Sequence, residues 1–78
     1  MPLASEPLRF RVESAEPYGW VVYRQGSRQT QFFGYQDEAV LCARRWAHAQ
    51  APSMLDVVDL AGQVTEHCVF EGRPTPQP

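Results

Sequence analysis

The chain has 78 residues, of which seven are arginine, none is lysine and nine are acidic, and its formal net charge at pH 7 is −2. This length allows one small domain, and the slightly negative charge excludes a protein that binds nucleic acid or acidic membranes by its overall charge. Aromatic residues make up 12% of the chain, which is too much apolar material for a disordered segment, so we expect a folded domain.

The two ends differ in composition from the rest of the chain. Residues 1–7 contain two prolines and residues 72–78 contain three. Such segments rarely join a packed element, so we predict flexible tails at both ends and a single domain over residues 8–71. The start of the chain has neither the basic residues nor the apolar run of a signal peptide, and no stretch reaches the ~20 apolar residues of a membrane span. We therefore expect a cytoplasmic protein.

The first element is a predicted strand over residues 8–14, whose apolar and polar residues alternate. The turn sequence AEPYG follows it, and residues 20–33 then predict a hairpin around Gly26 and Ser27, a pair that favours a type II′ turn. This hairpin places residue 20 opposite residue 33 and residue 21 opposite residue 32. Trp20, Val22 and Phe33 then share one face of the hairpin, and the other face holds Val21, Tyr23 and Phe32.

A single amphipathic helix is predicted by the sequence YQDEAVLCARRWAHAQ, residues 35–50. Acidic residues in its first turn and arginines in its second half suit the helix dipole, and Pro52 marks its end. Spacing of 100° per residue gives one apolar stripe with Cys42 at its edge, made of Ala39, Val40, Ala43, Trp46 and Ala47.

A second hairpin is predicted over residues 54–70 around Ala61 and Gly62. In the simplest register Asp56 lies opposite His67, Met54, Val58 and Leu60 share one face, and the other face holds Leu55, Val57, Val64, Cys68 and Phe70. A one-residue bulge at the turn would change these pairings. The element order is β-β-β-α-β-β, which predicts an α+β domain with one helix packed on an antiparallel sheet.

One helix covers only one face of such a sheet, so the other face is the first candidate site. We expect an uncovered apolar patch made of Val21, Tyr23 and Phe32, joined by Met54, Val58 and Leu60 of the second hairpin. A large patch of this kind usually marks an interface. The alternative is that the tails or a strong sheet twist cover it. We therefore expect an interaction or assembly module that binds itself, as a homodimer, or binds a protein partner.

A second candidate surface is the solvent side of the helix, where Arg44, Arg45 and His48 lie beside Leu41. Exposed arginines on a helix are most often only a solvated face, so this surface is the weaker candidate for binding a partner.

Nucleic-acid binding is the alternative function. Four arginines of the predicted strands, together with tyrosines that could stack on bases, would supply a basic surface: Arg9, Arg11, Arg24 and Arg28. Arg24 and Arg28 are expected on opposite faces of their hairpin, however, which divides the set.

We expect neither an enzyme nor a metal, cofactor or small-molecule site. Cys42 and His48 lie about 240° apart around the helix by the 100° spacing, and His67 and Cys68 point to opposite faces of a strand, so the four do not converge as zinc ligands must. The two thiols are expected to be reduced. Asp56 with His67 is the best catalytic pair available, but an exposed cross-strand charge pair is its more common role.

Several short motifs resemble a small bacterial family called domain of unknown function 2188. They are W-V-V-Y-R-Q-G from Trp20 to Gly26, Phe33, E-A-V from Glu38 to Val40, A-R at Ala43 and Arg44, Ala47, and V-V-D-L-A-G-Q-V from Val57 to Val64. The match covers about residues 20–70. The chain departs from the family pattern in having Tyr35 at the helix cap and no lysines. The resemblance implies a strand-strand-helix-strand-strand domain without an established activity, and it carries over no catalytic residue.

Overall fold

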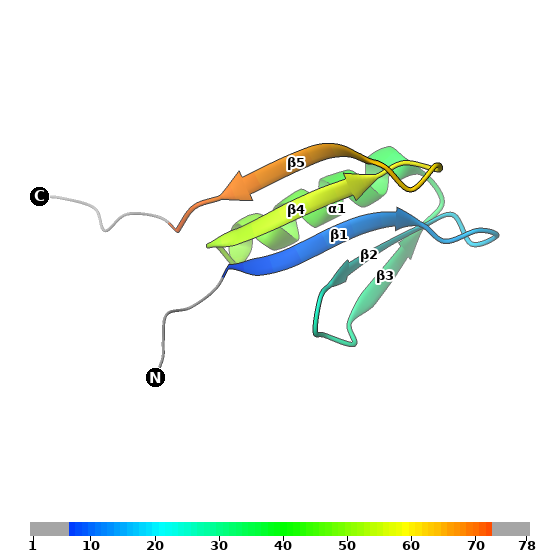
Figure 1. Cartoon of the computed structure of the whole chain (residues 1–78). Coiled ribbons are helices and arrows are strands. Elements are labelled where there is room, and N and C mark those ends of the chain that lie inside the picture. The colour runs from blue at the N-terminus through cyan, green and yellow to red at the C-terminus, as the bar shows by residue number, and fades with distance from the viewer. Residues whose placement is uncertain (1–6, 73–78) are drawn as a thin grey trace, which may run out of the picture.

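The computed structural model describes residues 7–72, so the predicted tails lie outside the described residues except for Pro7 and Gly72. The described chain forms a single α+β domain with one helix packed on a five-stranded sheet (Figure 1). The predicted fold class and element order are thus confirmed. The elements are β1 (Leu8–Ser14), β2 (Trp20–Arg24), β3 (Thr30–Phe33), α1 (Gln36–Ala49), β4 (Ser53–Val58) and β5 (Val64–Phe70).

The strand order in the sheet is β3-β2-β1-β4-β5, so the first strand of the chain lies at the centre. β1 pairs antiparallel with β2 but parallel with β4. The sheet is therefore mixed, and the expectation of a wholly antiparallel sheet is wrong at this one pair. Its cause is α1, which carries the chain back from the end of β3 to the start of β4, so that β4 runs in the direction of β1.

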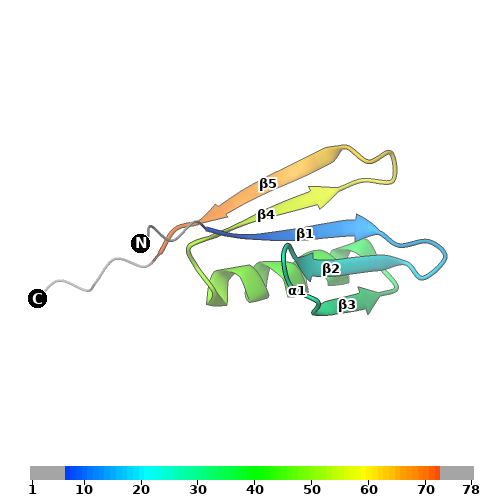
Figure 2. The same ribbon diagram turned by 60° about the horizontal axis from the view of Figure 1, so that its bottom comes forward.

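The hydrophobic core lies between α1 and one face of the sheet (Figure 2). Phe10 and Trp46 meet there with their ring centroids 5.4 Å apart. The predicted helix stripe is confirmed, since its alanines are fully buried and Val40 and Trp46 pack against the same core. Among residues 7–72 nine apolar residues are buried: Phe10, Val12, Val22, Ala39, Ala43, Ala47, Leu55, Val57 and Val58.

The end of α1 is tied to the sheet by Ser53, the first residue of β4. Its side chain is completely buried, and its hydroxyl donates a hydrogen bond of 2.6 Å to the carbonyl oxygen of Ala47. The amide of Gln50 donates to the same oxygen at 3.1 Å, so this carbonyl group at the end of the helix accepts two hydrogen bonds. Arg24 adds a second link through a 3.1 Å bond from Nη1 to the side-chain oxygen of Gln50.

The hairpin of β2 and β3 has the predicted register, with Trp20 opposite Phe33 and Val21 opposite Phe32. Its turn differs from the prediction. The amide of Ser27 donates to the carbonyl oxygen of Arg24 at 3.0 Å, and Gly26 has a φ of +84°. Gly26 therefore occupies the third position of the turn, where type II turns need a positive φ, instead of the second position that a type II′ turn would give it.

The hairpin of β4 and β5 keeps the predicted pair of Asp56 and His67, but its register shifts between Val57 and Val58. Beyond the shift Val58 pairs with Val64. Val64 therefore shares a face with Val58, and the expectation that it shares the face of Val57 is wrong. The cause is a bulge, which places one extra residue in one strand and so reverses the faces that follow it.

Candidate functional site

The face of the sheet that α1 leaves uncovered carries a row of five polar side chains across all five strands. The strand register aligns them as Thr30, Tyr23, Arg11, Asp56 and His67, and we refer to them as the polar row. Because residues two apart in a strand share a face, all five belong to the uncovered face. The uncovered face is therefore divided by polar groups.

Glu13 connects two members of the polar row. The hydroxyl of Tyr23 donates a 2.9 Å hydrogen bond to Oε2 of Glu13, and Nε of Arg11 lies 2.8 Å from the same oxygen. The Nε–H of Arg11 is buried without a hydrogen-bond acceptor, so its contact with Glu13 is an ion pair whose N–H direction does not suit a hydrogen bond. Further along the row Nδ1 of His67 lies 2.5 Å from Oδ1 of Asp56.

The position of Tyr23 in the polar row shifts the pKa of its phenol group. Partial burial of the phenol raises the pKa of Tyr23 above its ordinary value, and the hydrogen bond and negative charge of Glu13 raise it further, whereas Arg11 acts in the opposite direction. Both main causes disfavour the phenolate, by removing water and by bringing a second negative charge close. The phenol therefore stays a hydrogen-bond donor at neutral pH.

The next row of the uncovered face, towards the β1–β2 and β4–β5 loops, holds apolar groups on both sides of Glu13. Phe32 is 59% exposed, and its ring centroid lies 6.3 Å from that of Tyr18, which is 73% exposed. These two rings line a hollow of about 400 Å³. Val21 pairs with Phe32 in the register, and we refer to Tyr18, Val21 and Phe32 as the aromatic corner. Val64, 50% exposed, lies on the same face at the other edge of the sheet.

The apolar patch expected from the sequence is thus only partly present. Val21 and Phe32 belong to it, but Tyr23 lies in the polar row and Val58 is buried. Leu60 lies in the loop between β4 and β5, outside the sheet. Tyr18 was not assigned to this patch by the sequence, because its position depends on how the loop between β1 and β2 folds back.

The helix surface lies on the opposite side of the sheet from the aromatic corner, so the two predicted surfaces do not form one site. Two of its three residues contact β5: Arg44 forms an ion pair with Glu66, and the ring of His48 lies 5.9 Å from that of Phe70, edge to face. Arg45 and Leu41 are exposed. A contact within the chain therefore accounts for Arg44 and His48.

The four arginines of the nucleic-acid hypothesis are not brought together. Arg9 and Arg11 lie on the uncovered face by strand alternation, and Arg24 bonds to Gln50 at the helix side. Arg28 lies in the exposed turn between β2 and β3. Arg11 also forms an ion pair with Glu13 on its own strand. The arrangement does not give a continuous basic surface.

The candidate metal ligands do not converge either. Over residues 7–72, no three side chains of histidine, cysteine, aspartate or glutamate are placed to hold a metal ion. Cys42 contacts Gln31 on β3, whereas Cys68 lies on β5 at the other edge of the sheet, and both are free thiols. Within this described part α1 is too short and too polar to cross a membrane.

Comparisons with known proteins add no assignment. No protein-family model matches the chain, and searches of curated proteins and of solved structures give no match. The resemblance to domain of unknown function 2188 stays a hypothesis based on the motifs quoted above.

Proposed function

We propose that this protein is a small interaction module that pairs with a second copy of itself through the uncovered sheet face. The observation that carries this proposal is the order of charges at the centre of that face, where Arg11 of β1 and Asp56 of β4 are direct neighbours in the polar row. A neighbouring cation and anion are complementary to the same pair of a second copy when a two-fold axis passes between them.

This two-fold axis lies between the sheets of the two copies. It runs parallel to the strands and is midway between β1 and β4. It places each Arg11 opposite the partner's Asp56. In the next row it brings Val21 of β2 towards the partner's Val64 on β5, because both strands lie the same number of positions from the axis. Phe32 and Tyr18, on the outer side of β2, then lie against the outer edge of the partner's β5. At these positions cations meet anions, and apolar side chains meet apolar side chains.

The size of this face predicts a weak dimer. Four strands of five to seven residues overlap across this axis and cover about 400 Å² at about 4.8 Å between strands and 3.3 Å per residue, so two copies bury about 800 Å² in total. This lies below the range of stable protein interfaces, where burial starts at about 1,200 Å². We expect a dimer that forms and separates readily.

The test is an exchange of charges. Arg11→Asp gives a chain with two anions at the centre of the face, and Asp56→Arg gives one with two cations, so each variant repels its own copy. A mixture of the two restores both opposed pairs in a heterodimer. We expect each variant alone to be monomeric by sedimentation velocity, and the equimolar mixture to dimerise at least as well as the unchanged chain.

Circular dichroism of each variant controls for folding, since both changes place like charges on neighbouring strands. Arg9→Asp is the matched control, because Arg9 lies on the same face but faces the partner's uncharged Met54 across this axis. Single variants that associate as strongly as the unchanged chain, or a mixture no more associated than its components, would rule out this pairing. Binding of nucleic acid that weakens steeply with salt and is lost on Arg9→Asp would instead favour the alternative function.

A further inference from the structure

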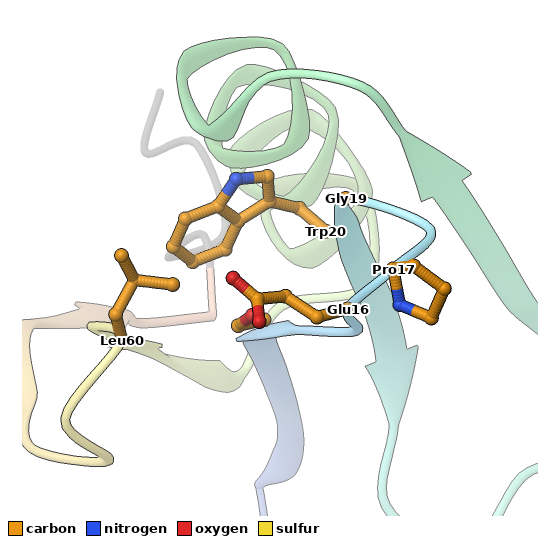
Figure 3. A pocket seen from close by; sticks show the side chains of 6 residues that line it. Glu16, Pro17, Gly19, Trp20 and Leu60 are labelled. Carbon is orange, nitrogen blue, oxygen red and sulfur yellow. The ribbon is translucent and has the colours of Figure 1, made fainter.

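A hollow of about 440 Å³ lies at the end of the sheet where the β1–β2 and β4–β5 loops approach each other (Figure 3). It is distinct from the uncovered face, because Trp20 belongs to the side of the sheet that packs against the core. In Figure 3 the side chain of Leu60 and the carboxyl group of Glu16 both point towards the indole of Trp20. The residues that line it are Ser14, Glu16, Pro17, Gly19, Trp20 and Leu60.

Glu16 is the one ionisable residue of this lining. Within residues 7–72 its carboxylate has neither a hydrogen bond nor an ion pair, whereas Glu13 and Glu66 are both paired with arginines. The hollow therefore combines an unpaired negative charge with an aromatic ring and an aliphatic side chain. These are the groups that favour an organic cation, which gains from a carboxylate and from the face of a tryptophan ring.

The loop that carries Glu16 is held in place by its own backbone. The amide of Ala15 donates to the carbonyl oxygen of Gly19 at 2.8 Å, and the amide of Tyr18 donates to the carbonyl oxygen of Ala15 at 2.6 Å. Gly19 has a φ of +100°, and a Cβ there would lie 2.3 Å from the carbonyl oxygen of Phe33. Only glycine fits this close approach, so the loop is fixed against β3 and Glu16 is presented from a defined position.

We propose that this hollow binds the side chain of an arginine in a partner peptide. The guanidinium group pairs with Glu16 and packs on the indole of Trp20, and the aliphatic part of the arginine lies along Leu60. Arginine suits the site better than lysine because its planar group binds a carboxylate and stacks on an aromatic ring at the same time. The site lies at one end of the sheet and does not depend on pairing of the uncovered faces.

Titration of the ¹⁵N-labelled chain with N-acetyl-arginine amide, followed by NMR, tests the proposal. We expect the indole N–H of Trp20 and the amides of Glu16 and Gly19 to shift in a saturable way. N-acetyl-citrulline amide has nearly the same shape without the charge, and we expect it to cause no saturable shift. Equal binding of the two probes would overturn the proposal.

Glu16→Gln removes the charge at an exposed loop position and keeps the shape of the side chain. We expect it to weaken binding of the arginine probe by about three- to fivefold, as for an exposed ion pair. Glu71→Gln is the matched control, because Glu71 is also exposed but follows β5 at the other end of the sheet. An arginine affinity that Glu16→Gln leaves unchanged, or that Glu71→Gln lowers equally, would contradict the assignment to this hollow.

Discussion

Glu13 is the residue on which the centre of the uncovered face depends. It accepts the hydrogen bond of Tyr23 on one neighbouring strand and pairs with Arg11 two residues before it on its own strand. Side chains on adjacent strands that bond in this way fix each other's rotamers as well as the strand register. Arg11 is therefore held in position for a partner without depending on Asp56.

The raised pKa of Tyr23 predicts how stability changes at alkaline pH. Because the folded state holds the phenolic proton more tightly than the unfolded state, this contribution is complete below the ordinary tyrosine pKa of about 10 and is lost as pH rises through the higher folded value. We expect the free energy of unfolding of the unchanged chain to fall more between pH 9 and pH 11 than that of Tyr23→Phe.

Urea unfolding at several pH values measures this difference. Tyr35→Phe is the control, because the side chain of Tyr35 is exposed and has no hydrogen bond within the described residues. It should keep the pH dependence of the unchanged chain. If Tyr23→Phe and Tyr35→Phe behave alike above pH 10, the hydrogen bond to Glu13 does not contribute to stability.

At the scale of elements, α1 approaches the sheet closely because its inner face is made of alanine. Ala39, Ala43 and Ala47 are each 0% exposed, and the larger Val40 and Trp46 pack at the sides of this contact. A helix placed on small side chains brings its backbone near the strands, so the few large core residues fill the remaining space.

Ala43→Leu tests this packing. Three added carbon atoms have no space at a fully buried site, and we expect a loss of about 1–3 kcal/mol in the free energy of unfolding, which chemical denaturation measures. Ala49→Leu makes the same change at an exposed position of the same helix and should alter stability by less than about 0.5 kcal/mol. Similar effects of the two changes would show that α1 does not rest closely on the sheet.

The elements and their faces could be predicted from the sequence, because alternation and helical spacing are local signals. The pairing of Trp20 with Phe33, and of Asp56 with His67, follows from hairpins whose strands are close in the chain. The neighbour of β1 could not be predicted in this way. Its parallel pairing with β4 joins segments about 45 residues apart, and no local pattern states which strand takes the centre of a sheet.

The candidate sites show the same limit. The outward face of Val21 and Phe32 was predictable, but the charges that divide this face come from β1 and β4, whose pairing was not expected. The hollow with Glu16, Trp20 and Leu60 joins two loops that are distant in sequence, so only the folded chain reveals it. The bulge at Val57 and Val58 has no residue signal such as a glycine within the strand.

At the scale of the whole molecule, a single helix on a five-stranded sheet leaves one face without a cover. That face has an aromatic corner at one edge, an exposed valine at the other and adjacent opposite charges between them. A two-fold partner covers both edges at once, which no single segment of residues 7–72 does. We therefore propose that the working form of this protein is a dimer of the uncovered faces.

Sedimentation equilibrium of the unchanged chain, from micromolar to millimolar concentration and beside Phe32→Glu, tests this claim most directly. We expect the mass of the unchanged chain to rise with concentration from 8.9 kDa towards twice that value. Phe32→Glu should remain at the mass of one chain, because Phe32 is exposed and its change to glutamate affects the contact and not the fold. A mass of one chain at every concentration for the unchanged protein would contradict the account, as would a dimer that Phe32→Glu leaves intact.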